Sequence, residues 1–142
     1  MAGISTPQAF KTLGPHLVSG QSLNEAVGNG LRNSRDAITA LAGGGATGAP
    51  LLAYGINHVT VTASAADSVM LPPSLPGAIV MVTNNGAQSL QVFANTVSSL
   101  SSGILDTING TAGATGVAVA AATTAMLMCS AYGAWFGPVA LA

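Results

Sequence analysis

The sequence predicts a mainly β protein: an antiparallel β-sandwich or small barrel (jelly-roll-like), preceded by an N-terminal arm and one α-helix. About seven short strand-like segments lie in the second half of the chain, and turn-forming residues separate them at intervals of roughly 8 to 12 residues. No long helical pattern comes between these segments. We therefore divide the 142 residues into an N-terminal region, 1–50, and an antiparallel β domain, 51–142.

The N-terminal region begins with an arm and continues into the predicted helix. Prolines and glycines interrupt any regular pattern over residues 1 to about 20. Ser22 and Glu25 then have the spacing of a capping box, which marks a helix start. Spacings of four and three residues follow, typical of a stripe along one helix face. We expect this stripe either to form an oligomer interface or to dock the helix on its own domain; it consists of Val27, Leu31, Ser34, Ile38 and Leu41.

Glycines end this helix in the segment from Gly43 to Pro50. The residues Gly43-x-Gly45-x-x-Gly48 formally match a dinucleotide-binding fingerprint, which requires a strand before the motif and a helix after it. Here a helix is expected before the motif and extended chain after it. We therefore interpret the segment as a flexible joint.

The β domain is predicted from alternation and from turn residues. In His58–Thr62, Val59 and Val61 share one side with Ala63. Turns are expected at Asn84-Asn85-Gly86, after which the next strand returns, at Asn109-Gly110 and at Tyr132-Gly133. The other predicted strands are Ser68–Leu71, Ala78–Thr83, Leu90–Ala94, Ile104–Ile108, Val117–Ala121, Ala125–Ala131 and Ala134–Phe136.

Charge is scarce in this chain. Charged residues make up 5% of it, against about 25% in an average soluble domain. The net charge of −1 gives no electrostatic basis for binding nucleic acid or an anionic membrane. We infer an obligate oligomer or a subunit of a larger assembly, because a monomer normally keeps charge on its surface for solubility. The alternative is a monomer coated in Ser, Thr and Asn.

Membrane insertion and secretion are not expected. A spanning helix needs about 20 consecutive apolar residues, and the best run, Gly116–Cys129, is shorter and contains Thr123 and Thr124. The first residues lack the apolar stretch of a signal peptide. The single cysteine cannot form an internal disulfide. We expect synthesis in a cytoplasm without classical export.

No residue pattern predicts catalysis or a cofactor. A nucleophilic site would need Cys129 with His16 or His58 as its base. Cys129 alternates with Leu127 and Ala125 on one strand face, so we expect it in the core. We predict no catalytic residues, no cofactor and no enzymatic activity.

Metal and sugar sites are also not favoured. The histidines, the cysteine and the acids offer no ligand pair at metal-binding spacing. We expect Asp106 to accept backbone amides in a tight turn, with a calcium site shared with Asp67 as the alternative. Trp135 and Phe136 would either close the core, which we favour, or form a sugar-stacking platform.

An ordered series of short motifs runs through residues 56 to 137. It comprises Val69-Met70-Leu71-Pro72, the segment Gly77 to Gly86 (GAIVMVTNNG), Leu90-Gln91-Val92-Phe93, the segment Asp106 to Gly110 (DTING), Gly116-Val117, Thr124-Ala125, Cys129 and Gly133-Ala134-Trp135-Phe136. The series resembles a β domain common among small virion structural proteins of tailed bacteriophages. It covers a little over half of the chain.

This resemblance implies a non-enzymatic capsid decoration (cement) protein or head fibre on the capsid surface of a virion. The N-terminal region would bind the major capsid protein, and copies of the chain would assemble, as a homotrimer in the expected case. Such a family brings no catalytic residues, cofactor or metal. The alternative is a tail, baseplate or fibre component that binds a host-surface glycan.

Overall fold

The structure is a computed structural model that describes residues 34–47, 49–96, 106–112 and 115–141. The chain divides into two compact units, Met1–Arg32 and Asn33–Ala142, and every described residue belongs to the second. The described residues form strands and contain no helix, so the mainly β class is confirmed. In particular, this part of the chain has no helix that could cross a membrane.

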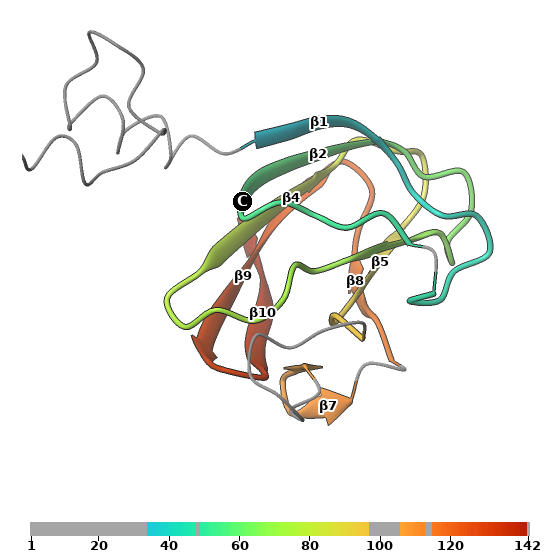
Figure 1. Ribbon diagram of the computed structural model, residues 1–142. Helices are drawn as coiled ribbons and strands as arrows, with labels where there is room; N and C mark the ends of the chain where they lie inside the picture. The colour runs from blue at the N-terminus through green and yellow to red at the C-terminus, as the bar shows by residue number, and fades with distance from the viewer. Residues whose placement is uncertain (1–33, 48, 97–105, 113–114, 142) are drawn as a thin grey trace, which may run out of the picture. The chain divides into compact units, whose positions relative to one another are not determined.

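The strands form two sheets. One sheet holds β1 (Ser34–Thr39), β2 (Gly55–Val61), β4 (Ile79–Asn84), β6 (Thr107–Ile108), β7 (Thr111–Ala112), β9 (Thr123–Ala131) and β10 (Ala134–Leu141). The other holds β3 (Ser68–Met70), β5 (Leu90–Phe93) and β8 (Val117–Val119). Their orders are β1-β2-β4-β9-β10-β6-β7 and β3-β5-β8. Figure 1 shows the smaller sheet as a second layer beside the larger one.

From β1 to β5 the chain winds repeatedly from one sheet to the other (Figure 1). β2 is followed by β3 in the second sheet, β4 returns beside β2, and β5 lies beside β3. Both of these neighbouring pairs are parallel, as is the pair β1–β2. Leu51 adds a parallel bridge to Met70. We call each passage of the chain from the larger sheet to the smaller one and back a coil. Successive coils whose strands pair in parallel are the arrangement of a short β-solenoid, which corrects the expected antiparallel sandwich or small barrel.

The strands after residue 105 pair mainly antiparallel, as the sequence predicts. β8 pairs with β5, β9 with β4, and β10 with β9, all antiparallel, while β10 and β6 are parallel. β6 and β7 form a hairpin around Asn109 and Gly110, whose φ angles of 53° and 76° match a tight turn with two left-handed residues. The predicted turns at Asn109-Gly110 and Tyr132-Gly133 are confirmed.

The predicted turn at Asn84 is present, but it does not make a hairpin. β5 leaves it for the other sheet, and the Asn84 side chain is fully buried at this corner between the layers. Its Oδ1 accepts from Thr62 Oγ1 at 2.9 Å and from the Gly86 amide at 3.1 Å. Its Nδ2 donates to the carbonyls of Gln88 and Val119, and also to that of Ala120. One side chain therefore joins the preceding coil, its own turn and the end of β8.

The helix prediction is wrong for the residues that the structure describes, from Ser34 onward. Residues Ser34–Thr39 form β1, the edge strand of the larger sheet, and the helix start at Ser22 lies outside the described residues. Ile38 is 3% exposed and belongs to the core, while Leu41 bridges Ser68. The strand carries a bulge, with Ala37 at a φ of 55°. The bulge shifts the alternation of side chains, so Ile38 points inward although its spacing from Ser34 and Leu41 looked helical.

The glycine segment after β1 is a loop that hydrogen bonds tie to neighbouring segments of the same unit. Gly43, Gly44 and Gly45 all have positive φ, and a Cβ on Gly44 would lie 2.4 Å from the Ala66 carbonyl oxygen. The Asp67 carboxylate accepts from the backbone amide of Gly43 at 3.2 Å. Extended chain follows the loop, so no helix N-terminus is available there for a pyrophosphate.

The hydrophobic core lies between the two sheets. Alternate residues of the long strands point into it, and Trp135 is its largest fully buried side chain. Two carboxylates are buried with it at 1–2% exposure, those of Asp67 and Asp106. The other core members are Ile38, Ala40, Leu52, Val59, Val69, Leu71, Val80, Val82, Leu90, Val92, Ala94, Ile108, Val119, Ala125, Leu127 and Cys129.

Candidate functional site

The strands β4 and β9 are apolar on both of their faces. Val80, Val82 and Leu127 point inward and are fully buried. Their sequence neighbours point to the opposite, outer face of the larger sheet, because successive side chains in a strand alternate. Of these neighbours, Ile79 is 47% exposed and Met128 is 39% exposed.

The strand register arranges these outward side chains in two rows. In the first row Ile56 lies opposite Met81, Met81 opposite Met126, and Met126 opposite Val139, which spans β2, β4, β9 and β10. In the second row Ile79 lies opposite Met128 and Met128 opposite Phe136. We call these seven residues the apolar face: Ile56, Ile79, Met81, Met126, Met128, Phe136 and Val139.

A polar row borders the apolar face. His58 lies opposite Thr83, and Thr83 lies opposite Thr124. The two threonine hydroxyl oxygens are 3.0 Å apart, and one donates to the other. The outer face therefore changes from apolar to hydrogen-bonding over two residues along each strand.

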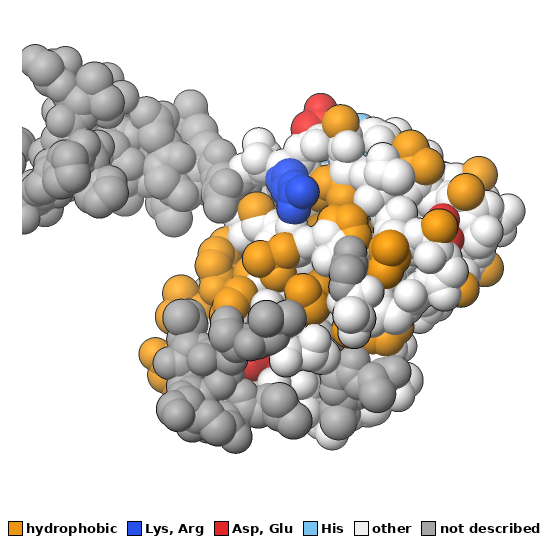
Figure 2. Space-filling model, turned by 45° about the vertical axis from the view of Figure 1, so that its right-hand side comes forward, with side chains coloured by type: hydrophobic (Ala, Val, Ile, Leu, Met, Phe, Trp, Pro, Cys, Tyr) orange, Lys and Arg blue, Asp and Glu red, His pale blue; other side chains and the backbone are white. Residues whose placement is uncertain are grey.

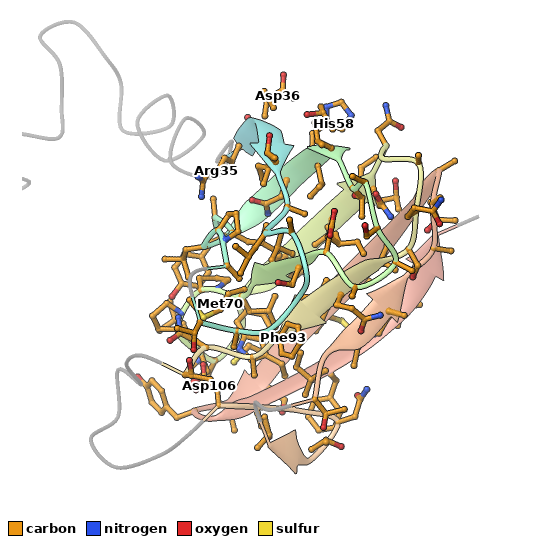
Figure 3. The ribbon with its side chains drawn as sticks, turned by 90° about the vertical axis from the view of Figure 1, so that its right-hand side faces the viewer. Arg35, Asp36, His58, Met70, Phe93 and Asp106 are labelled. Carbon is orange, nitrogen blue, oxygen red and sulfur yellow. The ribbon has the colours of Figure 1, made fainter. Side chains whose placement is uncertain are left out.

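Among the described residues, exposed charged or titratable side chains gather on β1 and the neighbouring strand β2. Among the described side chains the charged ones at the surface are Arg35 and Asp36, since Asp67 and Asp106 are buried. Asp36 Oδ1 lies 2.7 Å from His58 Nδ1, and Figure 3 shows both side chains together at the same edge of the sheet. The Ala37 amide, and then His58, lower the pKa of the Asp36 carboxyl. Arg35 donates to the Leu51 carbonyl.

The rest of the described surface is polar without charge, or apolar. Figure 2 shows one side of the molecule, where hydrophobic and uncharged atoms prevail and charged side chains are few. The exposed aliphatic and aromatic side chains outside the apolar face are Leu51, Val61, Leu75 and Tyr132.

The cysteine lies in the core, as the sequence predicts. Cys129 is 3% exposed, and its thiol donates to the Ala131 carbonyl oxygen at 3.2 Å. Burial raises the pKa of this thiol, which favours the protonated form over the nucleophilic thiolate. Its proposed bases are not brought to it in the described structure: His58 pairs with Asp36, and His16 lies outside the described residues.

The two candidate metal-binding carboxylates are held by different segments. Asp67 accepts from the backbone amides of Ala63 and Ser64 at 2.7 and 3.0 Å. Asp106 accepts from the amide and hydroxyl of Ser74, at 2.8 and 2.7 Å, rather than from amides of its own turn as predicted. Within the described ranges no group of three or more His, Cys, Asp or Glu residues could hold a metal ion.

The aromatic pair divides between core and surface. Trp135 is fully buried, which confirms its predicted core position, so it provides no sugar-stacking platform. Phe136 is 47% exposed and belongs to the apolar face.

The predicted interface stripe is not assembled as a helix face. Val27 and Leu31 lie outside the described residues, Ser34 is exposed at the start of β1, and Ile38 packs into the core of its own unit. Self-association through these residues stays a prediction.

Sequence reasoning missed the apolar face, although a signal for it exists. The segments Ala78–Val82 and Ala125–Cys129 are apolar at consecutive positions. In a strand with one face in solvent, apolar and polar residues alternate. A strand that is apolar at consecutive positions is expected to bury both of its faces. One of these is the core, and the second is the outer face.

The comparisons with known proteins give no relative: no protein-family model, curated protein or solved structure matches this chain.

Proposed function

We propose that this chain is a non-enzymatic structural protein of a phage virion, a capsid decoration (cement) protein or head fibre that binds the major capsid protein through its N-terminal region. The observation that carries the proposal is the apolar face, on a surface where the described residues expose almost no charge. Contiguous exposed apolar side chains of this kind mark sites of contact with other proteins.

The physical advantage of such a surface is cohesion between subunits. Burying apolar area contributes roughly 25 cal/mol per Å² before the cost of association is subtracted. A capsid repeats each contact many times, so modest contacts would add up over its surface. The resemblance of residues 56 to 137 to virion β domains supports the same proposal.

The test is co-sedimentation of the full-length chain with capsids assembled from the major capsid protein encoded in the same genome. We expect saturable binding with a fixed number of chains per capsid protein. A variant lacking residues 1–20 should stay in the supernatant, whereas Leu75→Lys, a substitution at an exposed loop position, should bind like the parent. Failure of the full-length chain to sediment with capsids at any concentration would contradict the proposal.

A further inference from the structure

We infer that the apolar face is the surface through which copies of this chain bind one another. The inference rests on the proposed function, since it names the contact by which a virion subunit of this kind would assemble. Its starting point is the continuous arrangement of seven apolar side chains on four neighbouring strands, five of them 39–52% exposed.

The distribution of charge favours a second copy as the occupant. A partner with an ordinary charged surface would bury ionised groups against a face that offers them no counter-charge, which is costly. A second copy presents the same uncharged face and buries no ion. The exposed charges of the described residues, Arg35 and Asp36, lie on the edge strand β1, outside the two apolar rows.

The outer surface of the larger sheet is large enough for a stable contact when the apolar face and the polar row are taken together. The nine residues of β9 correspond to about 30 Å and four strands span about 20 Å across the sheet, an area of about 600 Å² that includes both. Each partner buries roughly 800 Å² in a standard interface, so the apolar face would form the centre of the contact rather than the whole of it.

The composition of the face also fits an interface. Met81, Met126 and Met128 lie in its middle, where their flexible side chains can adapt to a facing surface. The row His58, Thr83 and Thr124 supplies a polar rim.

The edge of the sheet is a poorer site for self-association than its face. β1 carries a bulge, a left-handed residue at Ala37 and two charged side chains, Arg35 and Asp36. Bulges and charges are the devices that keep an edge strand from pairing with another chain. β7, at the other edge, has only two residues.

The experiment measures self-association of the full chain by light scattering on a sizing column over a range of concentrations. We expect twice the 13.8 kDa of one chain, because a face that packs against the same face of a second copy closes as a dimer. Met128→Lys should weaken self-association about 100-fold, because it places a charge in the middle of the contact. The matched control is Leu75→Lys, at 41% exposure against 39% for Met128, which should leave the mass unchanged.

A second measurement locates the contact. A photo-cross-linking amino acid in place of Phe136 should join one copy to β4, β9 or β10 of another copy. Trp135, the single tryptophan and fully buried, reports by its fluorescence whether each variant is folded.

The outcomes separate this inference from the proposed function. A monomeric parent chain, or a folded Met128→Lys variant that assembles like the parent, would overturn the inference even if the chain binds capsids. Assembly through the face by a chain that fails to bind capsids would overturn the function and keep the inference.

Discussion

Residues 34–93 and residues 106–141 both build strands, but these strands find their partners differently. In the first region neighbouring strands are parallel and come from successive coils, so each partner lies a full coil away in the sequence. In the second region β9 and β10 follow each other directly and pair antiparallel, as do β6 and β7. The parallel coils therefore depend on the side-chain contacts that fix the chain where it passes from one sheet to the other, which we call the corners. The hairpins depend on the backbone of their own turns.

Buried polar side chains hold the corners of the coils. Asn84 joins three segments, Asn57 bonds both the amide and the carbonyl of Ala53, and Asp67 bonds the amides of two loops. All three residues are at most 2% exposed. In the hairpin of β6 and β7 the left-handed backbone of Asn109 and Gly110 reverses the chain instead.

The largest effect is expected from Asn84→Ala. The change leaves Thr62, Gly86 and the Val119 carbonyl without their buried partner, which should lower the free energy of unfolding by about 3 kcal/mol. Urea unfolding followed by Trp135 fluorescence measures it. Asn85→Ala, at the exposed neighbouring position, should change the stability by less than about 0.5 kcal/mol. Equal effects of the two changes would mean that the corner does not hold the coils.

The sequence predicted most strands but not their partners. The alternation and turn residues located β3, β4 and β9 well, because such patterns are local. Parallel pairing between coils has no local pattern, and the residues Asn84-Asn85-Gly86 suit either a hairpin or a corner. The segment from Ser34 to Leu41 matched a helical stripe because a bulge shifts the strand alternation there.

The candidate site was less predictable than the fold. The low charge indicated an assembled protein, but the register that aligns Ile79 with Met128 and Phe136 is a tertiary property. The core positions of Cys129 and Trp135 were predicted, since each lies in an alternating strand whose inward partners are apolar.

Two glycines give the next comparison. A Cβ on Gly86 would lie 2.3 Å from Thr62 Oγ1 and 2.4 Å from the Thr62 backbone nitrogen, so Gly86→Ala should cost about 2 kcal/mol of stability. Gly110→Ala meets open space and carries only the strain of its φ of +76°, about 1 kcal/mol. Thermal or urea unfolding ranks the two variants. A Gly110 variant less stable than the Gly86 variant would show that the turn, not the corner, is the more demanding site.

Acid should destabilise the coils by protonating the Asp67 carboxylate. The backbone amide of Ser64, with those of Ala63 and Gly43, lowers the pKa of this carboxyl below its ordinary 3.8, although burial opposes the shift. A lowered folded-state pKa means that the ionised group stabilises the protein fully above pH 3.8 and loses this contribution as the pH falls through the folded value. Asp67→Asn should therefore lower the melting temperature at neutral pH, and the gap from the parent should close in acid.

The gap between Asp67→Asn and the parent is expected to be the smallest of the three effects, because the amide oxygen of Asn still accepts some of the same hydrogen bonds. A gap that stays constant from neutral pH into acid would assign the loss to packing rather than to the charge. Hydrogen exchange locates the effect: in acid the amides of Gly43, Ala63 and Ser64 should lose protection before those that pair β9 with β10. Simultaneous loss in both regions would mean that coils and hairpins unfold as one unit despite their different pairing.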